Sequence, residues 1–232
     1  MSATLVTESR LRLRAPREVS ALLMRPPDPA CLLVLAHGAG AGMRHPSMEA
    51  LCAELAGHGI ATYRFQFPYM ESGGGRPDSP QVAVETVRAA VAAAGEAAPA
   101  LPLFAGGRSF GGRMTATGAA ESPLPGVRGL IFFAFPLHPA GRPGTVRAEH
   151  LSHVEVPMLF LQGTRDTLAD LELLRPLVAG LSPRANLHVL KGADHAFHVL
   201  KRSGRTDQEI LDEIGVTVRE WTDQVAIPPP AC

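Results

Sequence analysis

The chain has 232 residues, of which 46% are hydrophobic and 19% are charged, a composition typical of a soluble globular protein with a buried core. Lys plus Arg equals Asp plus Glu at 22 each, so no overall field would attract nucleic acid or an acidic membrane. The cysteines, Cys31, Cys52 and Cys232, are too scattered for a disulfide framework or a metal cluster. We expect one domain, spanning residues 1–232, with no nucleic-acid or membrane partner.

Neither a leader nor a membrane segment is predicted. Residues 1–16 lack the continuous apolar stretch of a secretory signal, and no segment reaches the ~18 apolar residues that span a bilayer. These features predict a cytoplasmic protein. The basic run 201–205 is interpreted as a solvated loop. The ending "IPPPAC" cannot continue a helix, so we expect residues 227–232 to be loose.

Apolar runs of strand length alternate with longer helical patterns along most of the chain. Strands are predicted at 10–14, 19–24, 31–38, 60–67, 102–108, 127–135, 157–162 and 186–190, and helices at 46–57, 79–94, 110–120, 168–180 and 206–225. The alternation favours a doubly wound α/β fold, with a mostly parallel sheet of seven or eight strands and helices on both faces. Ligands of such sheets bind outside the carboxyl ends of the strands.

The stretch Gly107–Gly111 fits the pattern G-x-S-x-G, with Ser109 at its centre. Catalysis at such a serine needs a strained strand-to-helix turn, and the small flanking residues avoid collisions with neighbouring elements. The pattern also occurs in ordinary turns that contain serine. Its place between a predicted strand and a predicted helix favours Ser109 as a nucleophile. The backbone N–H of Phe110 then points at an oxyanion.

A serine nucleophile needs a base, and nine histidines compete for that role. His195 follows a short apolar strand at the carboxyl edge of the predicted sheet, which favours it. The alternatives that the pattern disfavours are His58, His150, His153, His188 and His198. The base in turn needs a carboxylate, and Asp166 directly follows a buried strand, whereas Asp170 is interpreted as a helix residue. The chain order serine, aspartate, histidine is that of α/β-hydrolases.

An oxyanion hole is predicted after an earlier strand, where the turn His37-Gly38-Ala39-Gly40 resembles an HGGG-type motif. The N–H groups of Ala39 and Phe110 are its predicted donors, and His37 is expected to brace the turn. A dinucleotide fingerprint is the alternative. It fails, because Met43 or His45 stands where its last glycine belongs. No metal or organic cofactor is expected.

With these motifs in register, the chain resembles the α/β-hydrolase superfamily over nearly its whole length. More narrowly, it is similar to a small dienelactone-hydrolase-like group that includes a testis-expressed protein and a subunit of a histone-acetyltransferase complex. The matching stretches are "HGAGAGMRHP", "GGRSFGGR", "FPLHPAGRP" and "FLQGTRD". Dienelactone hydrolases use a cysteine nucleophile where this chain has Ser109, so their substrate is not transferred. The resemblance implies a fold and a triad rather than a substrate.

About 20 residues separate the predicted strands 127–135 and 157–162, too few for a cap domain. An open, shallow site follows, which favours small or water-soluble acyl substrates over long lipid chains. Candidate pocket residues are His37, Gly40, Arg44, Arg108 and His138, and the loop 69–80 is a candidate wall. The arginines either bind an anionic substrate or bond to nearby carbonyls and carboxylates. We expect a serine hydrolase of small acyl esters or thioesters. Alternatives are a scaffold module and an acyltransferase, and the sequence leaves open a monomer or a homodimer.

Overall fold

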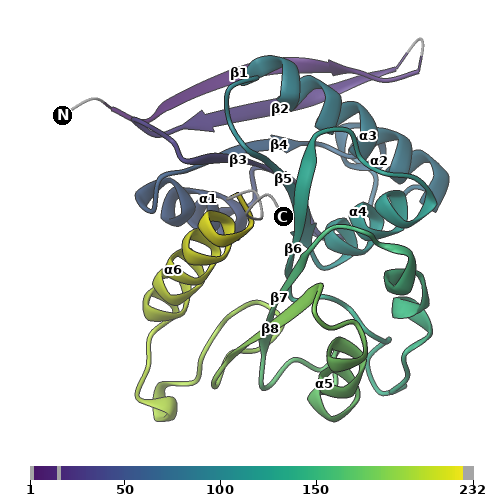
Figure 1. The fold of residues 1–232 in the computed structure, drawn as a ribbon, viewed down its shortest axis with the longest axis vertical. Helices are drawn as coiled ribbons and strands as arrows, with labels where there is room; N and C mark the ends of the chain where they lie inside the picture. Colours follow the sequence, from purple (N-terminus) through teal and green to yellow (C-terminus); the bar gives the residue numbers. More distant parts are fainter. Residues whose placement is uncertain (1–2, 15–16, 227–232) are drawn as a thin grey trace, which may run out of the picture.

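The computed structural model describes residues 3–14 and 17–226. Its core is one eight-stranded sheet in the order β1-β2-β4-β3-β5-β6-β7-β8 (Figure 1). The strands are β1 (Leu5–Arg12), β2 (Glu18–Arg25), β3 (Cys31–Ala36), β4 (Ile60–Phe65), β5 (Leu103–Arg108), β6 (Val127–Phe133), β7 (Met158–Gly163) and β8 (Ala185–Leu190). The tail 227–232, with Cys232, lies outside the described residues.

Strands β3 to β8 are parallel to one another, whereas β2 runs antiparallel to both β1 and β4. The predicted mostly parallel sheet of seven or eight strands is therefore confirmed. Strand β1 begins at Leu5, earlier than the predicted 10–14. The prediction missed this start because the first six residues of the strand are exposed and carry no apolar pattern. The parallel strands end at one edge of the sheet, where the loops after β3, β5, β7 and β8 meet.

Helices cover both faces of the sheet, as predicted (Figure 1). The α-helices are α1 (Pro46–Gly57), α2 (Pro68–Glu71), α3 (Pro80–Ala97), α4 (Phe110–Glu121), α5 (Leu171–Gly180) and α6 (Asp207–Ala226). The buried side chains of α1 and α6 form one core with one face of the sheet, and those of α3, α4 and α5 form a second core with the other face.

Three short helices fall where the sequence indicates only loops. Helix α2 lies at the start of the predicted loop 69–80, and a 3-10 helix, η1 (Val146–His153), lies between β6 and β7. A second 3-10 helix, η2 (Lys201–Ser203), lies in the basic run predicted as a loop. Segment 134–157 contains no helix besides η1, so no cap domain covers the carboxyl edge between β6 and β7.

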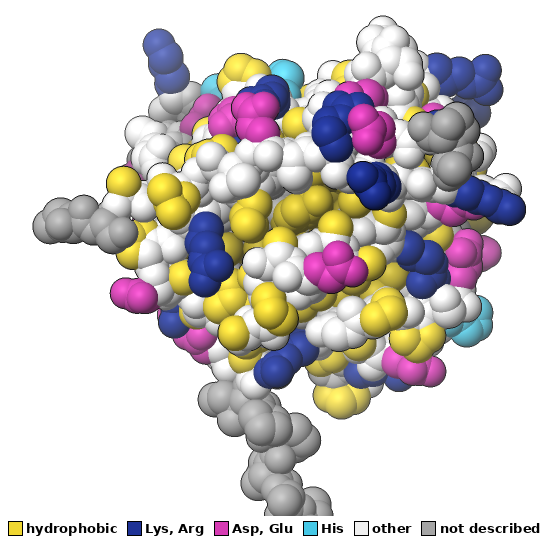
Figure 2. All heavy atoms as spheres, turned by 90° about the horizontal axis from the view of Figure 1, so that it is seen from above, with side chains coloured by type: hydrophobic (Ala, Val, Ile, Leu, Met, Phe, Trp, Pro, Cys, Tyr) yellow, Lys and Arg dark blue, Asp and Glu magenta, His cyan; other side chains and the backbone are white. Residues whose placement is uncertain are grey.

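The edge of the sheet at β1 is exposed. Seen from above, this side of the molecule has hydrophobic side chains in its middle and charged side chains of both signs around them (Figure 2). Arg10 of β1 pairs with Glu71 of α2 across 2.6 Å. This ion pair ties the antiparallel hairpin of β1 and β2 to the segment after β4. Within the described residues, none of the helices combines the length and the apolar character needed to cross a bilayer.

Candidate active site

Ser109 lies at a sharp turn between β5 and α4, with φ 50° and ψ −114°. A positive φ is strained for a residue with a side chain, and such strain costs about 1–3 kcal/mol. The two flanking glycines allow the turn. A Cβ on Gly107 would lie 2.6 Å from the carbonyl oxygen of Ala36, and one on Gly111 would lie 2.5 Å from it. The fold therefore excludes larger residues at positions 107 and 111.

Three of the predicted side chains, each from a different loop, meet at the carboxyl edge. His195 Nε2 lies 2.9 Å from Ser109 Oγ, and His195 Nδ1 lies 2.7 Å from Asp166 Oδ2. With the proton on Nδ1 donated to Asp166, Nε2 is left to accept the hydroxyl proton of Ser109. The arrangement places a hydroxyl, an imidazole and a carboxylate in continuous hydrogen-bond contact.

The carboxylate of Asp166 is buried and accepts two further hydrogen bonds. Gln162 Nε2 donates to Oδ2 across 2.5 Å, and the backbone N–H of Leu168 donates to Oδ1 across 2.8 Å. These donors fix the orientation of the carboxylate. Sequence reasoning missed Gln162, although a polar residue inside the apolar strand "MLFLQG" is a signal that could have found it. Asp170, the rejected alternative, is the N-cap of α5.

None of the five disfavoured histidines contacts Ser109. His188 pairs with Glu213 across 2.7 Å, and His198 pairs with Asp207 across 2.8 Å. His58 lies between Glu54 and Asp212. His150 and His153 belong to η1, where burial lowers the pKa of His150 to about 4.

The predicted oxyanion loop, residues 37–40, lies against the turn at Ser109. A Cβ on Gly38 would be 3.9 Å from the Cβ of Ser109. Among the described residues, the backbone N–H groups of Ala39 and Phe110 donate to no acceptor. Phe110 is the first residue of α4, so its N–H has no intrahelical partner and lies at the positive end of the helix dipole. Both groups are free to bind an anion.

His37 is buried and braces this loop. Its Nε2 accepts a hydrogen bond from the backbone N–H of Phe67 across 3.0 Å, and its Nδ1 lies 2.7 Å from the carbonyl oxygen of Gly38. Accepting at Nε2 requires a ring with its proton on Nδ1 only, and burial lowers the pKa of His37 to about 4. His37 is therefore neutral at pH 7 and ties the loop to the chain after β4.

Tyr69 of α2 is a second tether, which sequence reasoning missed. Its hydroxyl donates to the carbonyl oxygen of Ala39 across 2.8 Å, and its ring packs edge-on against Phe110. The backbone N–H of Tyr69 is in turn fixed by Asp78. Part of the predicted loop 69–80 thus holds the oxyanion loop from behind. No local pattern signals it, because the contact joins segments 30 residues apart.

The remaining candidate pocket residues lie in different surroundings. Gly40 has open space where a side chain would be. Arg44 is exposed and pairs with Glu8 across 2.6 Å. His138 is buried, accepts at Nε2 from the backbone N–H of Asp170, and lies with Nδ1 2.9 Å from the carbonyl oxygen of Pro139. Arg108 is half-buried and bonds to Ser47.

Two hollows border the hydrogen-bonded residues. One, of about 540 Å³, lies between the loops after β6 and β7 and is lined by His138, Asp166 and Asp170 among others. The other, of about 190 Å³, lies on the α1 side and is lined in part by Arg108 and Ala196, the neighbours of Ser109 and His195. The carboxyl edge therefore has room for a small substrate on either side of Asp166 and His195.

Residues 29–223 match the family model described as "Alpha/beta hydrolase domain", which covers most of the chain. The chain belongs to the α/β-hydrolase family.

Several solved α/β-hydrolase folds are similar to it over their whole length. A dienelactone hydrolase from Anabaena variabilis has a TM-score of 0.73 and 17% identity, covering 95% of this chain and 98% of its own. An α/β serine hydrolase homologue from Coxiella burnetii has a TM-score of 0.71 and 21% identity, over 92% and 96%. A serine hydrolase without a lid from Xanthomonas campestris has a TM-score of 0.70 and 23% identity, over 97% and 96%. At these identities the likeness establishes the α/β-hydrolase fold.

Proposed function

We propose that this α/β hydrolase is a serine hydrolase that cleaves esters or thioesters of small acyl groups. The observation that carries the proposal is the continuous contact from Ser109 through His195 to Asp166, at 2.9 Å and 2.7 Å. A base within hydrogen-bond reach activates a serine hydroxyl, and a buried carboxylate fixes the tautomer that the base needs. The strained backbone at Ser109 supports the same role.

In the first half of the reaction, Ser109 Oγ attacks the carbonyl carbon while His195 Nε2 takes the hydroxyl proton. The carbonyl oxygen becomes an oxyanion, which accepts hydrogen bonds from the N–H groups of Ala39 and Phe110. The tetrahedral intermediate then collapses. The bond to the alcohol or thiol breaks, His195 returns its proton to that leaving group, and the acyl group remains on Ser109.

In the second half, water replaces the leaving group. His195 removes a proton from the water, whose oxygen attacks the acyl carbon, and the same two N–H groups hold the second oxyanion. Collapse releases the carboxylic acid, and the proton on His195 returns to Ser109 Oγ. Asp166 keeps its negative charge throughout and stabilises the imidazolium. His195 carries the proton in each transfer, and the two backbone N–H groups only hold the oxyanion.

The open carboxyl edge of the sheet supports the proposal that the substrates carry small acyl groups. Segment 134–157, between β6 and β7, holds only the 3-10 helix η1, and the bordering hollows are about 540 and 190 Å³. The hollow with mostly apolar walls has a volume of only about 190 Å³, which favours a short chain over a long lipid chain. We include in this proposal that the chain is similar to the small dienelactone-hydrolase-like group. That resemblance does not identify a substrate.

The test is labelling with a fluorophosphonate probe, followed by mass spectrometry of the adduct, on the wild type and Ser109→Ala. Such a probe reacts with a serine that has a base and an oxyanion hole in place. We expect one adduct, on Ser109, that disappears in the variant. An unlabelled wild-type protein with an intact circular dichroism spectrum would contradict the proposal and favour a scaffold with a hydrolase fold.

A further inference from the structure

Arg108 stands directly before the proposed nucleophile, and its side chain leaves the strand end toward α1. Its Nη1 donates to Ser47 Oγ across 2.7 Å, and its Cζ lies 5.8 Å from the ring centroid of Phe197. These contacts hold the guanidinium between the first turn of α1 and the loop that carries His195. Arg108 is thus fixed beside the reacting groups rather than free to swing into solvent.

No ion pair neutralises this arginine. In the part of the chain that the structure describes, Arg108 forms none, whereas Arg44 pairs with Glu8 and the buried Arg64 pairs with Glu49. Burial lowers the pKa of Arg108, and the more distant carboxylates of Asp194 and Asp166 oppose that effect. A guanidinium keeps its charge at neutral pH even so. The site therefore holds a positive charge that the described residues leave without a direct counter-ion.

The unused donors of Arg108 reach open space. Its guanidinium makes one hydrogen bond among the described residues, to Ser47, and none of its other nitrogens is sealed from solvent. Arg108 lines the 190 Å³ hollow, whose walls are mostly apolar and include Leu51, Phe197 and Leu211. Asp207 also lines it, but its carboxylate accepts from His198 and from the backbone N–H of Val199.

We propose that Arg108 and this hollow form a subsite for a carboxylate carried by the substrate. A planar guanidinium with free donors matches a carboxylate, and the apolar walls suit the short chain that joins the carboxylate to the reacting carbonyl. The substrate class becomes short esters or thioesters with a second, anionic end. This inference rests on the proposed hydrolase function, because it takes Ser109 as the place where the substrate reacts.

The test compares substrates that differ only in charge. One arm uses monoethyl glutarate and its carboxamide, which place the charge on the acyl side. The other uses the acetyl ester of γ-hydroxybutyrate and its carboxamide, which place it on the alcohol side. In at least one arm, we expect the wild type to favour the carboxylate in kcat/KM by roughly tenfold to a hundredfold, the strength of charge-assisted hydrogen bonds. The favoured arm tells which side of the ester lies in the hollow.

Arg108→Gln should reduce this preference to about onefold, and Arg108→Lys, which keeps the charge but loses the planar fork, should retain part of it. The ratio within each variant is the readout, so a general loss of activity does not affect it. The matched control is Arg202→Gln, which removes the same charge from an exposed arginine of η2 and should keep the wild-type ratio.

A second readout needs no turnover. Glutarate should slow fluorophosphonate labelling of Ser109 more than glutaramide does, and Arg108→Gln should remove the difference. If Ser109 is labelled but neither esters nor protection distinguishes carboxylate from carboxamide, the subsite is wrong and the hydrolase proposal stands. If the folded wild type is not labelled at all, the hydrolase proposal itself fails.

Discussion

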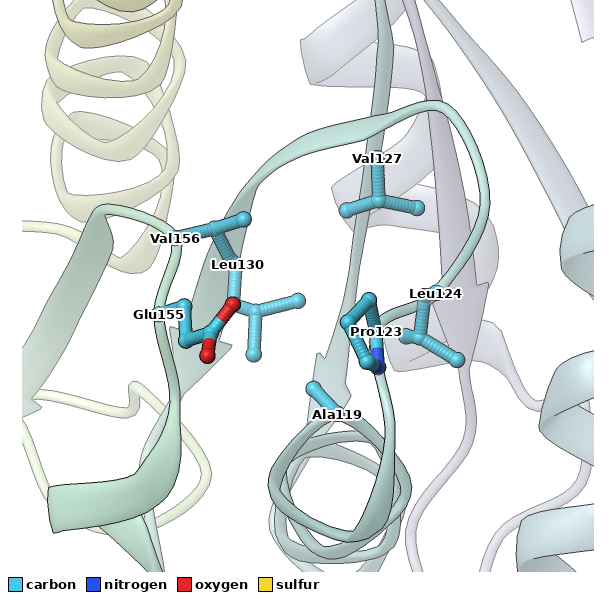
Figure 3. A pocket seen from close by; sticks show the side chains of 7 residues that line it. All are labelled: Ala119, Pro123, Leu124, Val127, Leu130, Glu155 and Val156. Carbon is cyan, nitrogen blue, oxygen red and sulfur yellow. The ribbon is translucent and has the colours of Figure 1, made fainter.

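The two ends of the parallel strands offer a contrast. At the amino ends of β6 and β7, Leu130, Val127 and Val156 line a hollow of about 70 Å³ whose one titratable group is Glu155 (Figure 3). At the carboxyl ends, the side chains of Ser109, His195 and Asp166 are linked by hydrogen bonds, the backbone at Ser109 is strained, and two backbone N–H groups have no acceptor among the described residues. The strands whose two ends differ in this way belong to a single sheet.

This contrast distinguishes a hollow left by packing, at the amino ends of the strands, from a candidate active site at their carboxyl ends. The amino-end hollow is lined by apolar side chains apart from Glu155, and no groups converge in it that could move a proton or hold a developing charge. The carboxyl end places polar atoms within hydrogen-bond distance of one another and leaves some donors unused. Because chemistry needs such convergent groups, changes at the carboxyl end should affect catalysis, and changes at the amino end should affect stability.

The largest effect is expected at His195. Replacing it with alanine removes the base, so kcat for a short acyl ester should fall roughly 10⁴- to 10⁶-fold while the protein stays folded. Asp166→Asn should cost about 10⁴-fold. The matched control is Asp170→Asn, which keeps the N-cap acceptor of α5 and should retain wild-type kcat. Equal losses in Asp166→Asn and Asp170→Asn would contradict the assignment of Asp166.

At the amino end, Leu130→Ala should lower the free energy of unfolding by about 2–5 kcal/mol, because it enlarges the hollow under a fully buried residue. Denaturant titration measures the loss. Well below the midpoint of that titration, the variant should keep wild-type kcat/KM. A folded Leu130→Ala protein with strongly reduced kcat would show that the two ends of the strands are coupled.

His37 predicts a pH dependence of stability. Its pKa is about 4 in the folded protein, against an ordinary value near 6.5, so the unfolded chain binds the proton more tightly. Stability is then fully present above pH 6.5 and is lost as pH falls toward 4, by about 3 kcal/mol. Urea unfolding at a series of pH values checks this. His37→Gln, whose amide oxygen can accept from Phe67, should remove the His37 part of the dependence and leave that of His150, whose pKa burial also lowers to about 4. A slope unchanged in the variant would exclude His37 as a source.

The smallest effect is expected at Tyr69. Tyr69→Phe removes the hydroxyl that holds the carbonyl of Ala39, which loosens one oxyanion donor. We expect kcat to fall roughly fivefold to thirtyfold with little change in KM, as for the loss of one hydrogen bond. Tyr63→Phe, a matched change at another buried tyrosine away from the loop, should leave kcat unchanged. A rise in KM alone would place Tyr69 in substrate binding instead.

Local pattern predicted most of the fold. The apolar runs that form β3, β5 and β7 are buried on both faces, and helix α1 begins and ends where its proline and its pattern indicate. The exposed strand β1 and the short helices α2 and η1 were missed or misplaced, since exposed or very short elements leave little periodicity. Buried elements show a hydrophobic pattern in the sequence, and exposed elements do not.

The sequence by itself determined the fold class and the strand-to-helix turn at Ser109, because each depends on neighbours along the chain. Only the tertiary structure decided that His195, among nine histidines, contacts Ser109, that Gln162 and Tyr69 support the site, and that Arg44 is paired while Arg108 is not. Those outcomes depend on which loops meet at the carboxyl edge. Packing between distant segments determines these contacts, and the local spacing of residues in the sequence does not reveal it.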